Sequence, residues 1–256
     1  MFTKSPAARR LREHPYGEKL KYKAIIFDVG DTLLEHYPNQ AQIYIERMQA
    51  IDLTINTSIA NDITVSIEKA AHEQIIKEQN GSPRMSDRDF ELMLDRAALK
   101  CIIKEQDLSK YIEKLNFIPV PEQKLRIIPG TLETLALLKQ HGFRLAIVSN
   151  HRTWLPDHLT KIGLAKFFET IVVSDIVGFE KPDIRIMQIV LERLSLNGSE
   201  CLYVGDHPFD VLCSKKAGID CVWLTAQNNI LPDSVPYKED FRLNKLTDLL
   251  TIFNHE

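Results

Sequence analysis

Residues 23–33 read Lys-Ala-Ile-Ile-Phe-Asp-Val-Gly-Asp-Thr-Leu, a short apolar run that ends at Asp28 and leads into a small polar loop. Such a run is typical of a strand buried on both faces, as in a parallel sheet. In an open parallel sheet, ligands bind beyond the carboxyl ends of the strands. The stretch therefore predicts a strand over residues 23–27, with Asp28 at the edge of the sheet where a site would form.

The second half of the chain alternates between strand-like and helical patterns. We expect strands over 144–148, 170–173, 201–204 and 221–224, and helices over 131–140, 154–162, 184–194 and 209–217. Strands that alternate with helices indicate a parallel sheet covered on both faces. The expected fold is therefore α/β, a doubly wound, Rossmann-like parallel sheet.

A helical block interrupts this series after its first strand. Apolar residues recur at helical spacing over 40–52, 58–79, 87–104 and 107–115, and Asn80-Gly-Ser-Pro83 breaks the second helix from the third. We interpret residues 38–118 as an inserted helical cap domain. Residues 22–37 and 119–256 then form the α/β core.

The composition favours an ordinary globular protein. Of the 256 residues 44% are hydrophobic, and the net charge of −3 lacks the basic excess of a nucleic-acid-binding protein. No apolar run approaches the roughly 20 residues needed to cross a membrane. Residues 1–21 form a basic extension without the apolar segment of a secretory signal, and the four cysteines show no Cys-x-x-Cys spacing. We expect a solvated extension and a cytoplasmic protein.

Polar residues follow the apolar strands at several strand ends. They are Asp28, Ser149-Asn150, Ser174-Asp175 and Asp206. Each of these residue types is also favoured as a helix cap, so one of them alone decides nothing. Their joint occurrence, with Lys181 between two of them in the sequence, predicts a site at the carboxyl edge of the sheet.

Four motifs in this order resemble those of the haloacid dehalogenase superfamily. They are Phe27-Asp-Val-Gly-Asp-Thr-Leu33, Val148-Ser-Asn150, Glu180-Lys-Pro-Asp183 and Val204-Gly-Asp-His-Pro-Phe-Asp210. The resemblance extends from about Lys23 to Leu224, and the insertion resembles the helical cap of the first subclass. It implies a hydrolase that acts on a phosphorylated small molecule.

The resemblance also implies a nucleophile and a metal site. Asp28 would attack phosphorus and form an aspartyl-phosphate. Mg²⁺, which prefers oxygen ligands, would be held by Asp28, Asp206 and the backbone carbonyl of Gly30. Asp210, one helical turn beyond Asp206, would either support the direct ligands or bind the metal through a water molecule.

The remaining implied roles concern the phosphoryl group. Ser149 and Asn150 would donate hydrogen bonds to it, and Lys181 would neutralise charge on Asp28 and on the phosphate. Thr32 would orient the nucleophile loop.

Gly30 departs from the pattern of this superfamily. Its phosphatases usually read Asp-x-Asp, where the second aspartate protonates the leaving group, whereas here the next aspartate is Asp31. General acid–base catalysis typically contributes about 10²–10⁴-fold. Three interpretations remain open. Asp31, His207 or a cap residue replaces the acid, or the substrate has a good leaving group, or the protein binds phosphate without turnover.

Two other activities of the superfamily lack the second aspartate. The 2-haloacid dehalogenases need no metal, and the retained Asp206 and Asp210 argue against them. The phosphonoacetaldehyde hydrolases use a cap lysine. Lys69 and Lys77 lie in the expected cap, but their polar surroundings favour solvated helix lysines. His207 is more readily explained as a structural hydrogen-bonding residue than as an acid or base.

Overall fold

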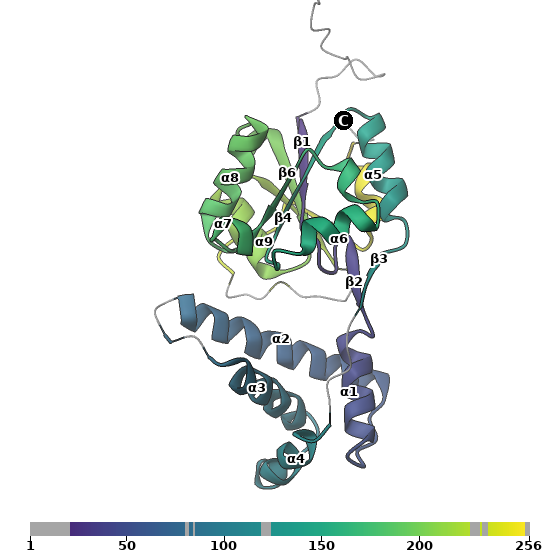
Figure 1. Cartoon of the computed structure of the whole chain (residues 1–256), viewed down its shortest axis with the longest axis vertical. Helices are drawn as coiled ribbons and strands as arrows, with labels where there is room; N and C mark the ends of the chain where they lie inside the picture. Colours follow the sequence, from purple (N-terminus) through teal and green to yellow (C-terminus); the bar gives the residue numbers. More distant parts are fainter. Residues whose placement is uncertain are drawn as a thin grey trace, which may run out of the picture. The chain divides into compact units, whose positions relative to one another are not determined.

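The computed structural model describes residues 21–79, 82–83, 85–118, 124–225, 231 and 235–253. The chain divides into two compact units, one formed by Met1–Glu35 with Ile127–Glu256 and the other by His36–Arg126 (Figure 1). The basic extension expected over residues 1–21 lies, apart from Lys21, outside the described residues.

A six-stranded parallel sheet forms the centre of the first unit. Its order is β5-β4-β1-β6-β7-β8, and every neighbouring pair is parallel. The strands are β1 (Ala24–Phe27), β4 (Arg144–Ser149), β5 (Thr170–Val173), β6 (Cys201–Gly205), β7 (Asp220–Leu224) and β8 (Phe241–Leu243). The expected doubly wound α/β fold is confirmed.

Helices cover both faces of this sheet. Figure 1 shows α7 (Ser174–Val177), α8 (Ile184–Leu194) and α9 (Pro208–Lys216) on one side, and α5 (Thr131–Gln140) and α6 (Leu155–Lys161) on the other. Apolar residues of α8 and α9 pack on side chains from the strands in one buried cluster. Because both faces of the central strands are buried, β1, β4 and β6 are apolar over most of their length and do not alternate, as the sequence indicated.

The three central strands bring distant motif residues together. Phe27 of β1 is in register with Ile147 of β4 and with Val204 of β6. The residues that follow these strands therefore meet at one edge of the sheet. Asp28, Ser149 and Asp206 lie there, each from a different part of the sequence.

The second unit is helical. It contains α1 (Gln40–Gln49), α2 (Thr57–Gln79), α3 (Asp87–Lys100) and α4 (Leu108–Leu115), which surround an apolar core of their own. A buried ion pair crosses this core, because Arg47 donates to both carboxylate oxygens of Asp95 at 2.5 and 2.9 Å. The side chains of Lys69 and Lys77 are exposed on α2.

Some elements were not predicted from the sequence. Strands β2 (Leu34–Tyr37) and β3 (Lys124–Ile127) pair with each other where the chain passes between the units. Both are four residues of mixed polarity, so neither reads as a strand. 3-10 helices also occur, three of them short, at Glu105–Asp107, Ala165–Phe167 and Gly198–Glu200, and a longer one at Leu246–Phe253.

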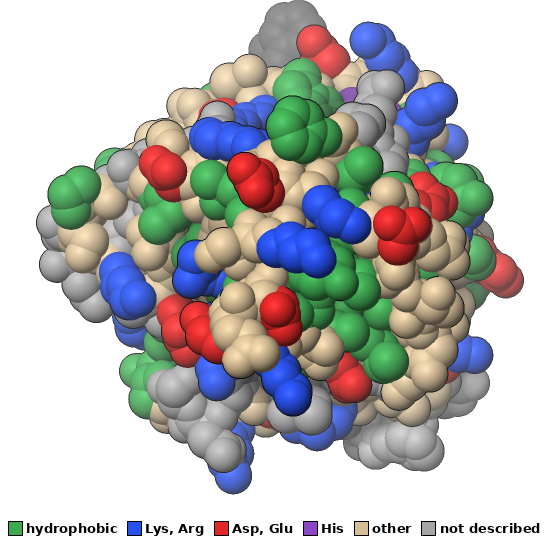
Figure 2. Space-filling model, turned by 90° about the horizontal axis from the view of Figure 1, so that it is seen from below, with side chains coloured by type: hydrophobic (Ala, Val, Ile, Leu, Met, Phe, Trp, Pro, Cys, Tyr) green, Lys and Arg blue, Asp and Glu red, His purple; other side chains and the backbone are tan. Residues whose placement is uncertain are grey.

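Among the described residues, no helix combines the length and apolarity that a membrane span needs. On the face shown in Figure 2, Lys and Arg side chains are interspersed with Asp and Glu. That face therefore lacks the one-signed basic field by which proteins attract phosphate backbones.

Candidate active site

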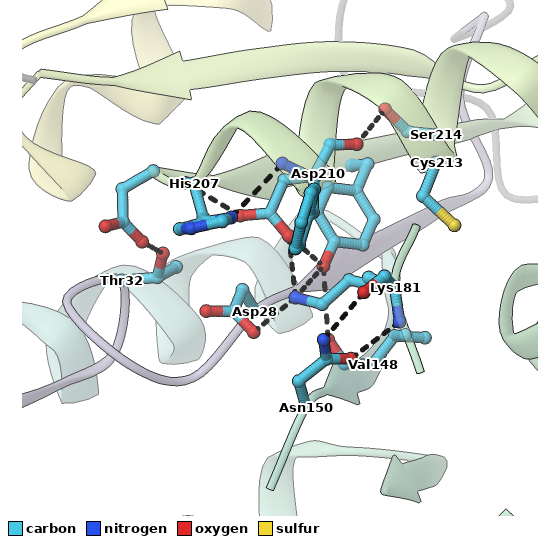
Figure 3. A network of polar contacts seen from close by, with 12 residues as sticks. Asp28, Thr32, Val148, Asn150, Lys181, His207, Asp210, Cys213 and Ser214 are labelled. Carbon is cyan, nitrogen blue, oxygen red and sulfur yellow. Dashed lines mark hydrogen bonds and ion pairs between the residues drawn. The ribbon is translucent and has the colours of Figure 1, made fainter. Parts of the chain in front are cut away.

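A buried lysine forms the centre of the site. The Lys181 Nζ atom lies 2.7 Å from Asp28 Oδ1, 2.6 Å from Asp210 Oδ1 and 3.1 Å from the hydroxyl of Tyr203 (Figure 3). Only 3% of Lys181 is exposed. The ammonium therefore has its three hydrogen-bond donors matched to three oxygen atoms inside the protein.

Three carboxylates converge on the same point. Oxygen atoms of Asp28, Asp206 and Asp210 lie within 4.8 Å of one another, and all three residues are buried. If all three groups were ionised, the cluster would carry three negative charges against the single charge of Lys181. A hard divalent cation with oxygen ligands would neutralise the excess, so these donors fit Mg²⁺.

The closeness of these buried charged groups shifts the pKa values of several of them. Burial, followed by repulsion from Asp28 and then Asp210, raises the pKa of Asp206 well above its ordinary value. Burial also raises the pKa of Asp28 to about 6, although the attraction of Lys181 opposes it. Burial lowers the pKa of Lys181, but the attraction of Asp210 and Asp28 outweighs it and leaves that pKa raised. The lysine therefore remains an ammonium.

Asp210 is held by protein contacts on both oxygens. Its Oδ1 accepts from Lys181 and, at 2.9 Å, from the Tyr203 hydroxyl, while its Oδ2 accepts from the backbone N–H of His207 at 3.0 Å. Gly205 makes this position possible, since a Cβ atom there would lie 2.3 Å from Oδ2. Asp210 thus anchors Lys181, and its expected water-mediated role toward a metal stays a prediction.

His207 begins helix α9 as its N-cap. Its Nδ1 accepts from the Phe209 N–H at 3.2 Å, and Asp210 completes the reciprocal capping box. These contacts are those of the structural role that the sequence favoured for this histidine. Its ring also packs edge-on against Phe209, with 4.8 Å between the ring centroids.

Tyr203 belongs to the site and was missed in the sequence. Its hydroxyl is fully buried, receives a hydrogen bond from Lys181, and lies 2.9 Å from Asp210 Oδ1 and 3.1 Å from the Val148 carbonyl oxygen. The one signal was a polar atom within the otherwise apolar run Cys201-Leu-Tyr-Val-Gly205. A buried hydroxyl needs a partner, so a tyrosine in such a strand indicates a polar neighbour.

The side chain of Asn150 binds the backbone of Lys181, a contact that the sequence did not predict. Its Nδ2 donates to the Lys181 carbonyl at 2.9 Å, and its Oδ1 accepts from the Lys181 N–H at 2.7 Å. The amide group therefore fixes the loop that carries the lysine. A hydrogen bond from Asn150 to a phosphoryl group stays a prediction.

The hydroxyls of Ser149 and Thr32 have unlike surroundings. Thr32 donates to Asp206 Oδ1 at 2.9 Å, so it orients a carboxylate of the cluster. Ser149 is buried at the end of β4, and within the described part of the chain its hydroxyl bonds to no protein group. A hydrogen bond from Ser149 to a phosphoryl group stays a prediction.

Gly30 and Asp31, which follow Val29, differ in backbone conformation. Gly30 has no positive φ, and a Cβ built on it meets nothing within 4 Å. Asp31, by contrast, has φ of 50°, in the left-handed region that aspartate tolerates better than most residues. The glycine is thus not required by the backbone, and the strained position belongs to Asp31.

The arrangement supports one kind of chemistry. Lys181 holds one oxygen of Asp28, and Figure 3 shows the other oxygen pointing away from the lysine. A fixed carboxylate of this kind can act as a nucleophile, and the ammonium beside it can neutralise an anionic electrophile. The site lies at the carboxyl edge of the sheet, where α/β proteins bind ligands.

The chain matches a known protein family and several characterised proteins. Residues 25–224 match the family described as haloacid dehalogenase-like hydrolase. Glyceraldehyde 3-phosphate phosphatase of Methanothermobacter thermautotrophicus is 29% identical, over 80% of this chain and 86% of its own. Phosphoglycolate phosphatase of Vibrio parahaemolyticus is 25% identical, over 90% of this chain and 95% of its own.

A solved structure agrees in fold. The HAD-hydrolase YfnB of Bacillus subtilis, solved with bound magnesium, superposes with a TM-score of 0.61 at 23% identity, covering 92% of this chain and all of its own. The family match spans more than half of the chain and includes each of the four motifs. The chain is therefore a member of the haloacid dehalogenase-like hydrolase family.

Proposed function

We propose that the protein is a magnesium-dependent phosphatase that forms an aspartyl-phosphate on Asp28. The observation that carries this proposal is the buried Asp28–Lys181 pair within the carboxylate cluster. Two relatives named above are phosphatases of small phosphorylated molecules, which supports phosphate esters as the substrate class. The helical unit would serve as the cap.

The reaction would follow two balanced steps. A carboxylate oxygen of Asp28 attacks phosphorus, the phosphorus–oxygen bond to the leaving group breaks, and that group departs with the electron pair. Water then attacks phosphorus of the aspartyl-phosphate, and the bond from phosphorus to the Asp28 oxygen breaks, which restores the carboxylate. The proton of the attacking water passes to solvent or stays on the released inorganic phosphate. Lys181 and the Ser149 hydroxyl would bind the phosphoryl oxygens in both steps.

Mg²⁺ would be held by Asp28, Asp206 and the Gly30 carbonyl. Asp210 would support these ligands or bind the cation through a water molecule. When bound, the cation would offset the negative charge on the phosphoryl oxygens and on the carboxylates. Asp206 is kept in place for this role by the hydrogen bond from Thr32.

The absence of an acid at Gly30 restricts the substrate. An alkoxide that leaves unprotonated is a poor leaving group, whereas a phenolate or a carboxylate leaves readily. We therefore infer that aryl or acyl phosphates are hydrolysed better than alkyl phosphates. In this respect the protein would differ from relatives that act on glyceraldehyde 3-phosphate or phosphoglycolate.

The nucleophile is tested by Asp28→Asn. The amide is nearly isosteric but not nucleophilic, so turnover of p-nitrophenyl phosphate should fall by at least about 100-fold. The wild type should show a phosphate adduct on Asp28 by mass spectrometry after rapid quenching. Asp157→Asn, an exposed aspartate of α6, is the matched control. A wild type that binds phosphate but releases no product would favour a non-catalytic phosphate-binding protein.

The metal site is tested by binding as well as by activity. Mg²⁺ at about 100 times its Kd should stabilise the folded wild type by about 2.7 kcal/mol, measured as a rise in Tm. Asp206→Asn should remove most of this rise, and chelator should abolish turnover until Mg²⁺ is restored. Full activity in chelator, with no change in Tm on adding Mg²⁺, would contradict the proposal.

The role of Gly30 is tested with esters of graded leaving-group pKa. In the wild type, kcat/KM should fall steeply from aryl to alkyl phosphates. Gly30→Asp should raise the alkyl rates by about 10-fold or more, because the backbone and the space around Gly30 accept a side chain. A flat dependence in the wild type, abolished by Asp31→Asn, would show that Asp31 already supplies the proton.

Tyr203→Phe tests the support of the lysine. Loss of the hydroxyl removes one acceptor of the Lys181 ammonium and one donor to Asp210, so kcat should fall by about 5- to 20-fold. Tyr22→Phe is the matched control, since the Tyr22 hydroxyl bonds to Asp220 outside the carboxylate cluster at a similar distance, 2.7 Å. Equal losses of stability with no difference in kcat would reduce Tyr203 to a structural residue.

A further inference from the structure

The loop that follows β4 is tightly fixed. The His151 N–H donates to the Ser174 hydroxyl at 3.0 Å, and the His151 carbonyl accepts from the Asp175 N–H at 3.3 Å. The Arg152 N–H donates to His151 Nδ1 at 2.8 Å, which sets the orientation of the imidazole. This loop begins at Asn150, whose amide is bonded to Lys181. It is thus built onto the active site.

Trp154 ends this loop and is clamped by two imidazoles. Its ring packs edge-to-face on His151, with centroids 4.6 Å apart, and on His158, with centroids 5.6 Å apart. Nevertheless, 48% of Trp154 is exposed. An indole that is already held in one orientation loses little conformational freedom when a ligand packs on it.

A second exposed apolar residue lies on the neighbouring segment. Ile176 is 53% exposed, and it follows Asp175, whose N–H is bonded to His151. The tryptophan loop and the start of α7 therefore lie side by side at the carboxyl edge of the sheet. We refer to His151, Trp154 and Ile176 as the rim patch.

We propose that the rim patch binds a planar aromatic group of the substrate, with Trp154 as its main contact. The proposal rests on the phosphatase function argued above. The phosphoryl group would lie between Asp28, Lys181 and Ser149, and the leaving group would extend from there along the loop that β4 continues into. Aromatic rings pack favourably on an indole in offset or edge-to-face geometry.

Two independent features of the chain thus favour the same substrate. Gly30 removes the acid that an alkyl leaving group needs, and the rim patch offers an apolar, aromatic surface at the same edge. Together they indicate an aryl phosphate ester, in which the ring both leaves readily and is recognised. Trp154 is a specificity residue and does not touch the reacting atoms.

The test compares two substrates that both leave easily. Trp154→Ala should raise KM for p-nitrophenyl phosphate by about 10-fold, with little change in kcat, and should leave acetyl phosphate unaffected. Trp154→Phe keeps an aromatic ring and should restore most of the affinity. Equal effects of Trp154→Ala on both substrates, or no effect on either, would overturn the proposal.

Binding can be followed without turnover. The chain has two tryptophans, and Trp223 is fully buried, so a ligand on the rim patch should change chiefly the fluorescence of Trp154. Phenylphosphonate, whose carbon–phosphorus bond resists phosphatases, should change the emission of the wild type. It should not change that of Trp154→Phe, and methylphosphonate should have no effect on either protein.

The kinetic and the fluorescence experiments distinguish failure of the phosphatase proposal from failure of the rim-patch proposal. If the wild type hydrolyses neither substrate, the phosphatase proposal fails, while the fluorescence titration still decides whether the rim patch binds an aromatic group. If both substrates are hydrolysed and phenylphosphonate leaves the emission unchanged, the phosphatase proposal stands and the rim patch does not bind the ring.

Discussion

The structure of the site depends on one interaction, the burial of the Lys181 ammonium between the carboxylates of Asp28 and Asp210. Removing these charges from water is costly, and the cost is offset only where every donor and acceptor has a partner. The surrounding residues meet that condition. Tyr203 completes the contacts of the ammonium, Asn150 fixes the lysine backbone, and the His207 N–H binds the far oxygen of Asp210.

The fold could be predicted from the sequence because the sheet is buried on both faces. Strands such as Ala24–Phe27 and Leu145–Val148 are apolar along their length, and α8 shows a clear helical period. The short strands Leu34–Tyr37, Lys124–Ile127 and Phe241–Leu243 carry no such pattern. They are strands because a partner strand lies beside them. Pairing between distant segments leaves no periodic pattern of apolar residues in the local sequence.

The site could be predicted only in part. The charged residues could be located because each follows a strand, and parallel strands bring their carboxyl ends to one edge. The sequence did not show which atom each side chain contacts. The Asn150 amide hydrogen-bonds to the backbone of Lys181, and His207 caps helix α9. In the sequence, Tyr203 could not be distinguished from the apolar core residues beside it. These outcomes depend on contacts between segments that are distant in the sequence.

The strand order also governs when the site can form during synthesis. β1 leaves the ribosome early, but its two neighbours are β4 and β6, which begin at Arg144 and Cys201. The helical unit, with its own apolar core, is complete before either partner has been made. An apolar central strand therefore lacks both of its neighbours until residues encoded well after the helical unit have been made. The cluster of Asp28, Lys181 and Asp210 consequently needs segments from both ends of the first unit, and a chain that ends before β6 lacks Asp206 and Asp210.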